Sequence, residues 1–165
     1  MICSRCNQEA TSLHYPSGYT PGEGVCPECT RKERLARAEA VPADKRWRNT
    51  KAQREALKAR FGGRCAYCGS ELGNKWHADH MESVYRLPDG TMENPEHNTI
   101  DNMMPACVPC NLHKHGLTLE EWREYLQRSA DILRRATSTF RAAERFGVIT
   151  VNDGPIKFFF EKQRD

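Results

Sequence analysis

The stretch "WHADHMES", residues 76–83, brings together three side chains that can bind a metal or carry a proton: His77, Asp79 and His80. Neighbouring residues on a strand point to opposite faces. Asp79 and His80 are therefore poorly placed to ligate one metal as equals, unless the strand ends there. Their adjacency favours a division of labour, in which one side chain holds a metal and the other handles a proton. The alternative is that the pair only caps a loop.

All eight cysteines of the sequence fall in C-x-x-C pairs, a spacing typical of zinc knuckles. Taken in chain order, the pairs predict two tetrathiolate zinc sites: Cys3, Cys6, Cys26 and Cys29, followed by Cys65, Cys68, Cys107 and Cys110. A redox role is the alternative for any single pair, but it is typical of a βαβ pattern, which is not obvious here. In the second site 38 residues lie between the two pairs, so a folded insert has to close it.

The hydrophobic fraction of the chain is 38% over 165 residues, which is lean for a self-sufficient core and makes zinc staples useful. The sequence has no N-terminal apolar run of the signal-peptide type and no apolar segment long enough to span a membrane. We therefore expect a cytoplasmic protein without membrane association. Disulfides are rare in that compartment, which again favours zinc for the cysteines.

Positive charge is concentrated in residues 31–64, which contain twelve Lys or Arg and four Asp or Glu. The formal net charge of the whole chain is +3, and two tetrathiolate zinc sites would bring it close to neutral. The local excess, rather than the total, predicts contacts with a nucleic-acid backbone. The alternative is a solvated linker and helix face. The candidate contacts are Arg46, Arg48, Lys51, Arg54, Lys58 and Lys114.

The pattern of apolar residues and helix caps predicts the elements around the chemical residues. A charged linker over 31–50 has a helical stretch at 31–40 and breaks near Pro42. A helix follows over 51–61, with Thr50 as its cap and a Gly pair as its stop. Residues 75–86 predict a strand, residues 87–98 a polar loop, and Cys107 to His115 a short helix.

The C-terminal part predicts helices and then a hairpin. Thr118 and Glu121 form a capping-box pattern, and apolar residues follow at helical spacing as far as residue 143. We expect one long amphipathic helix, or two in tandem, that ends before Gly147. Residues 148–161 predict a β-hairpin around Asp153–Gly154. The predicted organisation is a zinc knuckle unit at 1–30, a basic linker at 31–50, a core at 51–120 and a helical and hairpin extension at 121–165.

Residues 55–120 combine the core cysteines and the Asp-His pair in a fixed order. After the first C-x-x-C pair of the core comes the Asp-His pair. Asn102 then lies five residues before Cys107, Asn111 directly follows Cys110, and Lys114 comes three residues later. In this order and spacing the sequence resembles the HNH endonuclease family. Many relatives have Pro where this chain has Ser83, and many have His where it has Asn111. Several independent elements nevertheless agree in order and spacing.

The resemblance implies a small, zinc-stabilised α+β protein. Its centre would be a ββα-metal core with an N-terminal zinc-ribbon-like unit, and C-terminal helices plus the hairpin would complete it. By position, Asp79 would be a metal ligand, His80 the general base, and Asn111 the second protein ligand. Asn102 would be the central Asn, which fixes the loop backbone and orients the His. The implied metals are two structural zinc ions and one catalytic Mg²⁺ or Mn²⁺.

The chemistry of these residue types agrees with that implication. Hydrolysis of a phosphodiester needs an activated water, a proton acceptor and a cation on the phosphate. Histidine has an unperturbed pKa of about 6.5 and can accept a proton at neutral pH. Carboxylate and amide oxygens are hard ligands, suited to Mg²⁺ or Mn²⁺. His77, His113 and His115 could add a ligand or a phosphate contact, although a surface or supporting role is the commoner use of such histidines.

We therefore expect a metal-dependent HNH endonuclease that hydrolyses double-stranded DNA without a small-molecule cofactor. The layout also resembles some small restriction and phage-borne nucleases, which would place it in a bacterial or phage-infected host cytoplasm. Alternatives are a non-catalytic, zinc-stapled nucleic-acid-binding adaptor, an RNA-directed nuclease, or a nuclease helper of a phage DNA-packaging machine. The sequence leaves a homodimer open.

Overall fold

The structure is a computed structural model that describes residues 1–13, 24–152 and 154–163. The chain divides into two compact units. Unit 1 comprises Met1–Arg48 and Val84–Asn102, and unit 2 comprises Asn49–Ser83 and Met103–Asp165. Among the described residues, none of the helices combines the length and the apolar character needed to cross a bilayer.

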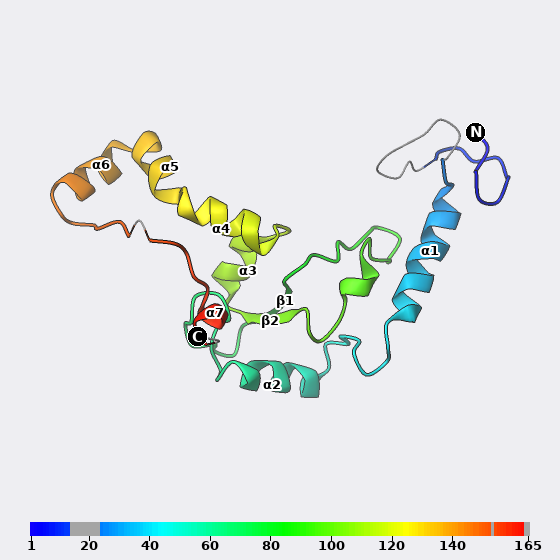
Figure 1. The fold of residues 1–165 in the computed structure, drawn as a ribbon, viewed down its shortest axis with the longest axis horizontal. Coiled ribbons are helices and arrows are strands. Elements are labelled where there is room, and N and C mark those ends of the chain that lie inside the picture. Colours follow the sequence, from blue (N-terminus) through cyan, green and yellow to red (C-terminus); the bar gives the residue numbers. More distant parts are fainter. Residues whose placement is uncertain (14–23, 153, 164–165) are drawn as a thin grey trace. The chain divides into compact units, whose positions relative to one another are not determined.

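Unit 1 is built around the helix α1, Pro27–Ala40 (Figure 1). Its N-cap is Cys26, whose sulfur accepts a hydrogen bond from the Cys29 backbone N–H at 3.5 Å. The helix therefore begins inside the Cys26–Cys29 pair, and the predicted helical stretch at 31–40 is confirmed. The insert 84–102 packs on it through the short 3-10 helix η1, Pro95–His97.

Unit 2 contains the only sheet among the described residues, an antiparallel pair of four-residue strands. The strand β1, His77–His80, pairs with β2, Met103–Ala106, so that His80 lies opposite Met103. The strand predicted over 75–86 is correct in place but too long. Its partner β2 offers only four residues, and every one of them is buried.

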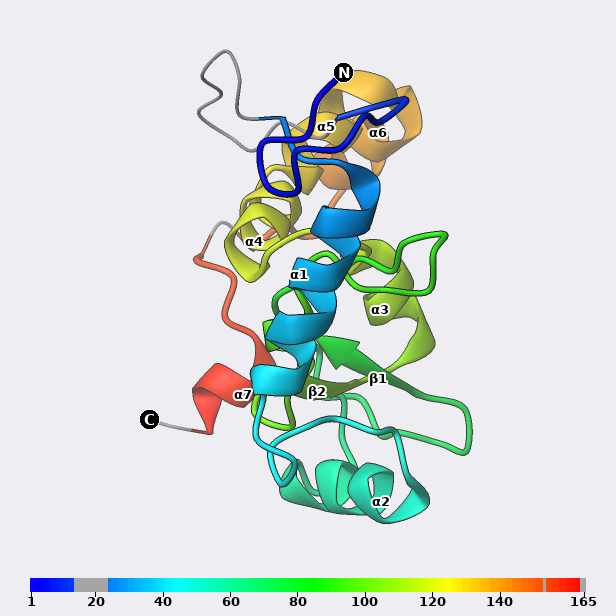
Figure 2. The same cartoon turned by 90° about the vertical axis from the view of Figure 1, so that its right-hand side faces the viewer.

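Two helices flank this strand pair on opposite sides in both views (Figures 1 and 2). The helix α2, Lys51–Arg60, has Thr50 as its N-cap, as predicted, with its hydroxyl accepting from the Gln53 N–H at 3.2 Å. The helix α3, Val108–Lys114, follows directly after β2 and confirms the predicted short helix. It contacts β1, whereas α2 contacts β2.

The C-terminal segment with apolar residues at helical spacing forms three helices rather than the predicted one or two. They are α4, Leu119–Gln127, α5, Ser129–Ala136, and α6, Ser138–Arg145. The predicted capping box at Thr118 and Glu121 is confirmed. The extra break comes at Thr137, which is extended and accepts a hydrogen bond from the Phe140 N–H at 3.2 Å. A residue that caps a new helix ends the previous one, although the apolar spacing continues through it.

The predicted hairpin at 148–161 is wrong. No strand forms in residues 148–152 or 154–161, Asp153 lies outside the described residues, and the short helix α7, Phe159–Lys162, closes the segment. Two backbone N–H groups of the segment bond the Cys65–Cys68 knuckle: Phe159 N–H bonds Tyr67 O at 2.9 Å, and Phe160 N–H bonds Ala66 O at 2.8 Å. The phenylalanines thus pack on the Cys65–Cys68 knuckle instead of pairing with a strand.

Candidate functional site

Both cysteine quartets assemble in the predicted combinations. Within each quartet the four sulfur atoms lie within 4.8 Å of one another. The Cys6 and Cys26 sulfurs are 3.8 Å apart, and so are the Cys68 and Cys107 sulfurs. Four thiolates about 2.3 Å from a tetrahedral zinc would be about 3.8 Å from each other, whereas disulfide sulfurs are about 2.05 Å apart. Each quartet could therefore hold one zinc ion.

In each quartet, hydrogen bonds favour the thiolate of one buried cysteine. The Cys26 N–H donates to the Cys3 sulfur at 3.2 Å, and this bond is the main cause that lowers the pKa of Cys3 to about 6. In the second quartet, a hydrogen bond from Cys110 lowers the pKa of Cys65 to about 4. The same sharing raises the pKa of Cys110, because its thiol keeps the proton that binds its neighbour. Thiolates are the form that zinc binds.

The second quartet also fixes the elements around β1. The Ala66 N–H in the knuckle bonds Pro105 O on β2 at 2.8 Å. Cys107 is the N-cap residue of α3, and Cys110 lies in its first turn. Zinc bound here would therefore connect the knuckle, β2 and the start of α3.

Asp79 is a buried carboxylate, 8% exposed, in the middle of unit 2. Its Oδ2 atom lies 3.1 Å from Lys114 Nζ and accepts a hydrogen bond from the Tyr67 hydroxyl. Burial, followed by the charge of Asp79, raises the pKa of Tyr67, which keeps that hydroxyl a donor. Within the described residues, the contacts of this carboxylate all go to Oδ2, and none goes to Oδ1. It remains the oxygen that a cation could use.

His80 is the last residue of β1. The strand thus ends at the Asp79–His80 pair, which is the condition under which both side chains can serve one site. The side chain of His80 is half-buried. Its carbonyl oxygen accepts a hydrogen bond from Lys114 Nζ at 2.7 Å. One lysine of α3 therefore touches both the side chain of Asp79 and the backbone of His80.

Asn111 lies within α3, one turn before Lys114. Residues three apart on a helix share a face. Because Lys114 reaches β1, the half-buried Asn111 is on the face of α3 that lies toward β1. An amide oxygen there and the Asp79 carboxylate have the chemistry of a hard-cation site.

Asn102 belongs to unit 1, in the insert that connects the two strands. Its Nδ2 donates to the carbonyl oxygen of His97 at 2.8 Å. The side chain thus ties together the last part of the insert before β2. Its predicted second task, the orientation of His80, stays a prediction.

Several predicted nucleic-acid contacts on α2 hold the segment that leads into β1. Arg54 donates to the Trp76 carbonyl oxygen at 3.0 Å and stacks on the Trp76 ring, 4.0 Å from its centroid. Lys58 Nζ donates to the Gly73 carbonyl oxygen at 3.2 Å. Lys51 is exposed, and its Nζ lies 3.8 Å from Glu55. Of these three, Lys51 has the charge most accessible to solvent.

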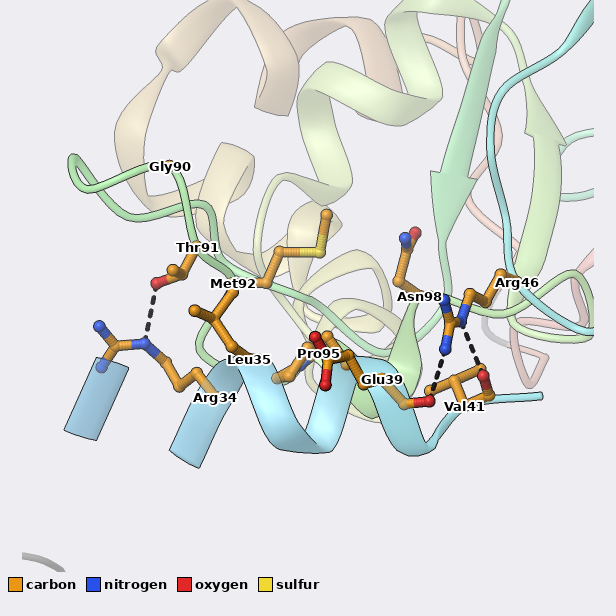
Figure 3. Close-up of a pocket in the computed structure, with 11 residues that line it drawn as sticks. Arg34, Leu35, Glu39, Val41, Arg46, Gly90, Thr91, Met92, Pro95 and Asn98 are labelled. Carbon is orange, nitrogen blue, oxygen red and sulfur yellow. Dashed lines mark hydrogen bonds between the residues drawn. The ribbon is translucent and has the colours of Figure 1, made fainter. Parts of the chain in front are cut away.

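The other predicted contacts also differ in their surroundings. Arg46 donates to the backbone oxygens of Val41, at 2.7 Å, and Glu39, beside a cavity of about 250 Å³ in unit 1 (Figure 3). Arg48 is exposed and lies 3.4 Å from Ala43 O. The Lys114 side chain is only 1% exposed, so its charge faces Asp79 rather than solvent.

The three other candidate histidines of the core, His77, His113 and His115, take different positions in the fold. His113 Nδ1 accepts a hydrogen bond from the Trp122 indole at 2.7 Å, which supports the packing of α3 on α4. His115 follows α3 with a positive φ of 51°, and His77 begins β1.

Tyr67 was not predicted as a site residue. Its place inside the "CAYC" knuckle was visible in the sequence, but its contact with Asp79 was not.

Comparison with known proteins gives one family and one relative. The sequence model of the HNH endonuclease family matches residues 65–116, so this segment is similar to HNH endonuclease domains. A protein of Bacillus subtilis (strain 168), the "SPbeta prophage-derived putative HNH endonuclease YoqL", is 34% identical over 83 residues. The alignment covers 48% of this chain and 35% of the relative, so the chain spans about a third of that protein's length. No solved structure matches the chain significantly.

Proposed function

We propose that the chain is a metal-dependent endonuclease that hydrolyses phosphodiester bonds in double-stranded DNA. One observation carries the proposal: inside the matched HNH domain, a buried carboxylate with a free Oδ1 adjoins a histidine at a strand end. Asp79 and Asn111 would hold one Mg²⁺ or Mn²⁺, since both offer hard oxygen ligands from facing elements. Two protein ligands leave coordination positions for phosphate oxygens and water.

In this proposal His80 is the general base, and its imidazole accepts a proton from the attacking water. The strand ends at His80, which lets its side chain and that of Asp79 approach one phosphate. A divalent cation, when bound, stabilises the charge on the phosphate in the transition state. Asn102 would hold the insert, and the second quartet would hold β2 and the start of α3 beside the proposed ligands.

The test is incubation of the pure, zinc-loaded protein with supercoiled plasmid, with Mg²⁺, with Mn²⁺, and with a chelator of both. Nicked or linear plasmid that forms only with a divalent cation supports the proposal. Plasmid that is bound but never cut at any cation concentration would instead favour the non-catalytic adaptor. A parallel incubation with RNA separates a DNA-directed enzyme from an RNA-directed one.

A further inference from the structure

Lys114 is a lysine whose charge lies inside the protein. Its side chain is 1% exposed, and Nζ lies 3.1 Å from Asp79 Oδ2 and 2.7 Å from the carbonyl oxygen of His80. Burying a charge is costly unless it is paired and hydrogen-bonded, as it is here. Such a residue contacts a bound phosphate poorly, because neighbouring side chains cover it. Lys114 instead contacts Asp79 and His80, the predicted metal ligand and the predicted general base.

Tyr67 adds a second donor to the same carboxylate oxygen. Its hydroxyl bonds Asp79 Oδ2, and its ring is held by Trp122, with centroids 5.1 Å apart, and by Phe158, at 5.7 Å. Tyr67 as a whole is 3% exposed. Both donors therefore come from fixed groups, one from the knuckle and one from α3. The carboxylate cannot turn without losing one or both of these bonds.

We propose that Lys114 and Tyr67 are positioning residues that make Asp79 a one-oxygen ligand and so select Mg²⁺-sized cations over Ca²⁺. The inference rests on the proposed role of Asp79 as a metal ligand. Mg²⁺ requires near-octahedral geometry at about 2.0–2.1 Å, whereas Ca²⁺ accepts six to eight oxygens and commonly a bidentate carboxylate. A carboxylate whose Oδ2 is occupied offers only Oδ1, which suits the smaller ion.

Lys114 also links the two elements that carry the predicted ligands. It extends from α3, one turn beyond Asn111, to the Asp79 side chain and the His80 backbone on β1. The separation of Asn111 and Asp79 is thereby restrained at one end. A restrained pair of ligands favours the cation with the stricter geometry, which again is Mg²⁺.

The experiment measures dissociation constants for Mg²⁺ and Ca²⁺ separately, by NMR titration of the ¹⁵N-labelled, zinc-loaded full chain, without any activity assay. The variants are Lys114→Met, Tyr67→Phe and, as a matched control, Lys162→Met on α7, where the lysine is exposed. Loss of the lysine charge strengthens binding of both divalent ions alike, so it cancels in the ratio of the two constants. The ratio reports the geometry.

We expect Lys114→Met to shift the ratio toward Ca²⁺ by about fivefold or more, Tyr67→Phe to shift it in the same direction by less, and Lys162→Met to leave it unchanged. An unchanged ratio in a folded Lys114→Met, or in Tyr67→Phe should the former not fold, overturns the inference. Asp79→Asn identifies the separate failure: if it binds both cations like the parent, the ligand assignment in the proposed function is wrong as well.

Discussion

At the scale of single residues, the Asp79–Lys114 pair decides what substitutions in the site will do. Both side chains are buried, and each satisfies the charge of the other. Removing one partner of a buried pair leaves the other charge uncompensated, whereas removing both does not. A loss of activity in an Asp79 variant would therefore combine a chemical effect and a structural effect, and the two need separate measurements.

Asp79→Ala should lower the free energy of unfolding by about 3–5 kcal/mol, because it leaves the Lys114 ammonium buried without its partner. The double variant Asp79→Ala, Lys114→Met should recover part of that loss. Urea denaturation of the zinc-loaded proteins measures both changes. Lys51→Met is the matched control, since Lys51 forms an exposed pair with Glu55 and should have little effect. A double variant less stable than Asp79→Ala alone would contradict this account of the pair.

At the scale of elements, the second cysteine quartet would hold the site together once zinc is bound. It joins the Cys65–Cys68 knuckle to β2 and to the start of α3. The first quartet lies in unit 1, at the start of α1. Since the quartets lie in separate compact units, their removal should have separable consequences.

Cys107→Ser should unfold the HNH domain, because a structural zinc contributes on the order of 10 kcal/mol to the folding of small zinc domains. Cys26→Ser should instead remove one zinc and leave unit 2 folded. Zinc analysis should give about two ions per chain for the parent and about one for Cys26→Ser. Circular dichroism and the NMR spectrum of β1 follow the fold. A Cys107→Ser protein with the parental melting temperature would count against this role of zinc.

The elements that were predicted correctly are those with local signals. Thr50 caps α2 and Thr118 caps α4 through side-chain bonds to residues three positions later, and such bonds depend only on neighbouring sequence. The cysteine quartets were predictable because zinc knuckles have a fixed spacing. The break at Thr137 was missed because the apolar period continues across it, although Thr is itself a capping residue.

The errors and omissions depend on contacts between distant segments. The 148–161 segment has alternating apolar residues, but its phenylalanines are stabilised by the Cys65–Cys68 knuckle, about 90 residues earlier in the chain. Lys114 was predicted at a plausible phosphate-binding position, yet its partner is Asp79. No spacing rule indicates that a lysine in a polar motif will be buried.

At the scale of the whole molecule, the basic segment carries less available charge than its composition indicates. The insert 84–102 places carboxylates against α1, so that Arg34 pairs with Asp89 at 2.7 Å and Arg37 with Glu96 at 3.0 Å. Hydrogen bonds from the Thr91 side chain and backbone lower the pKa of Asp89, with Arg34 contributing, so that carboxylate stays charged near neutral pH. Both arginines are thus neutralised within unit 1.

DNA binding should weaken with salt, because contacts to phosphates release about 0.9 counterion each. Lys51→Gln should reduce the slope of log K against log salt by about 1. Arg37→Gln is the matched control: Arg37 bonds both carboxylate oxygens of Glu96, at 3.0 and 3.3 Å, whereas the Lys51 side chain is 91% exposed and 3.8 Å from Glu55. The slope for Arg37→Gln should therefore stay the same. Fluorescence anisotropy with duplexes of different sequence, over a range of salt, measures the slopes. An equal decrease for both variants would mean that pairing with the insert does not withhold charge from DNA.

The central claim is that His80 removes a proton during DNA cleavage, and His80→Ala in the plasmid assay tests it most directly. The His80 side chain acts in the proposed reaction, and His80 belongs to neither cysteine quartet. We predict that single-turnover nicking with Mg²⁺ or Mn²⁺ falls by about 10²–10⁴-fold, while the two zinc ions and the DNA affinity are retained. Nicking by His80→Ala at the parental rate, with the fold intact, would contradict the role of His80 and the assignment of this site.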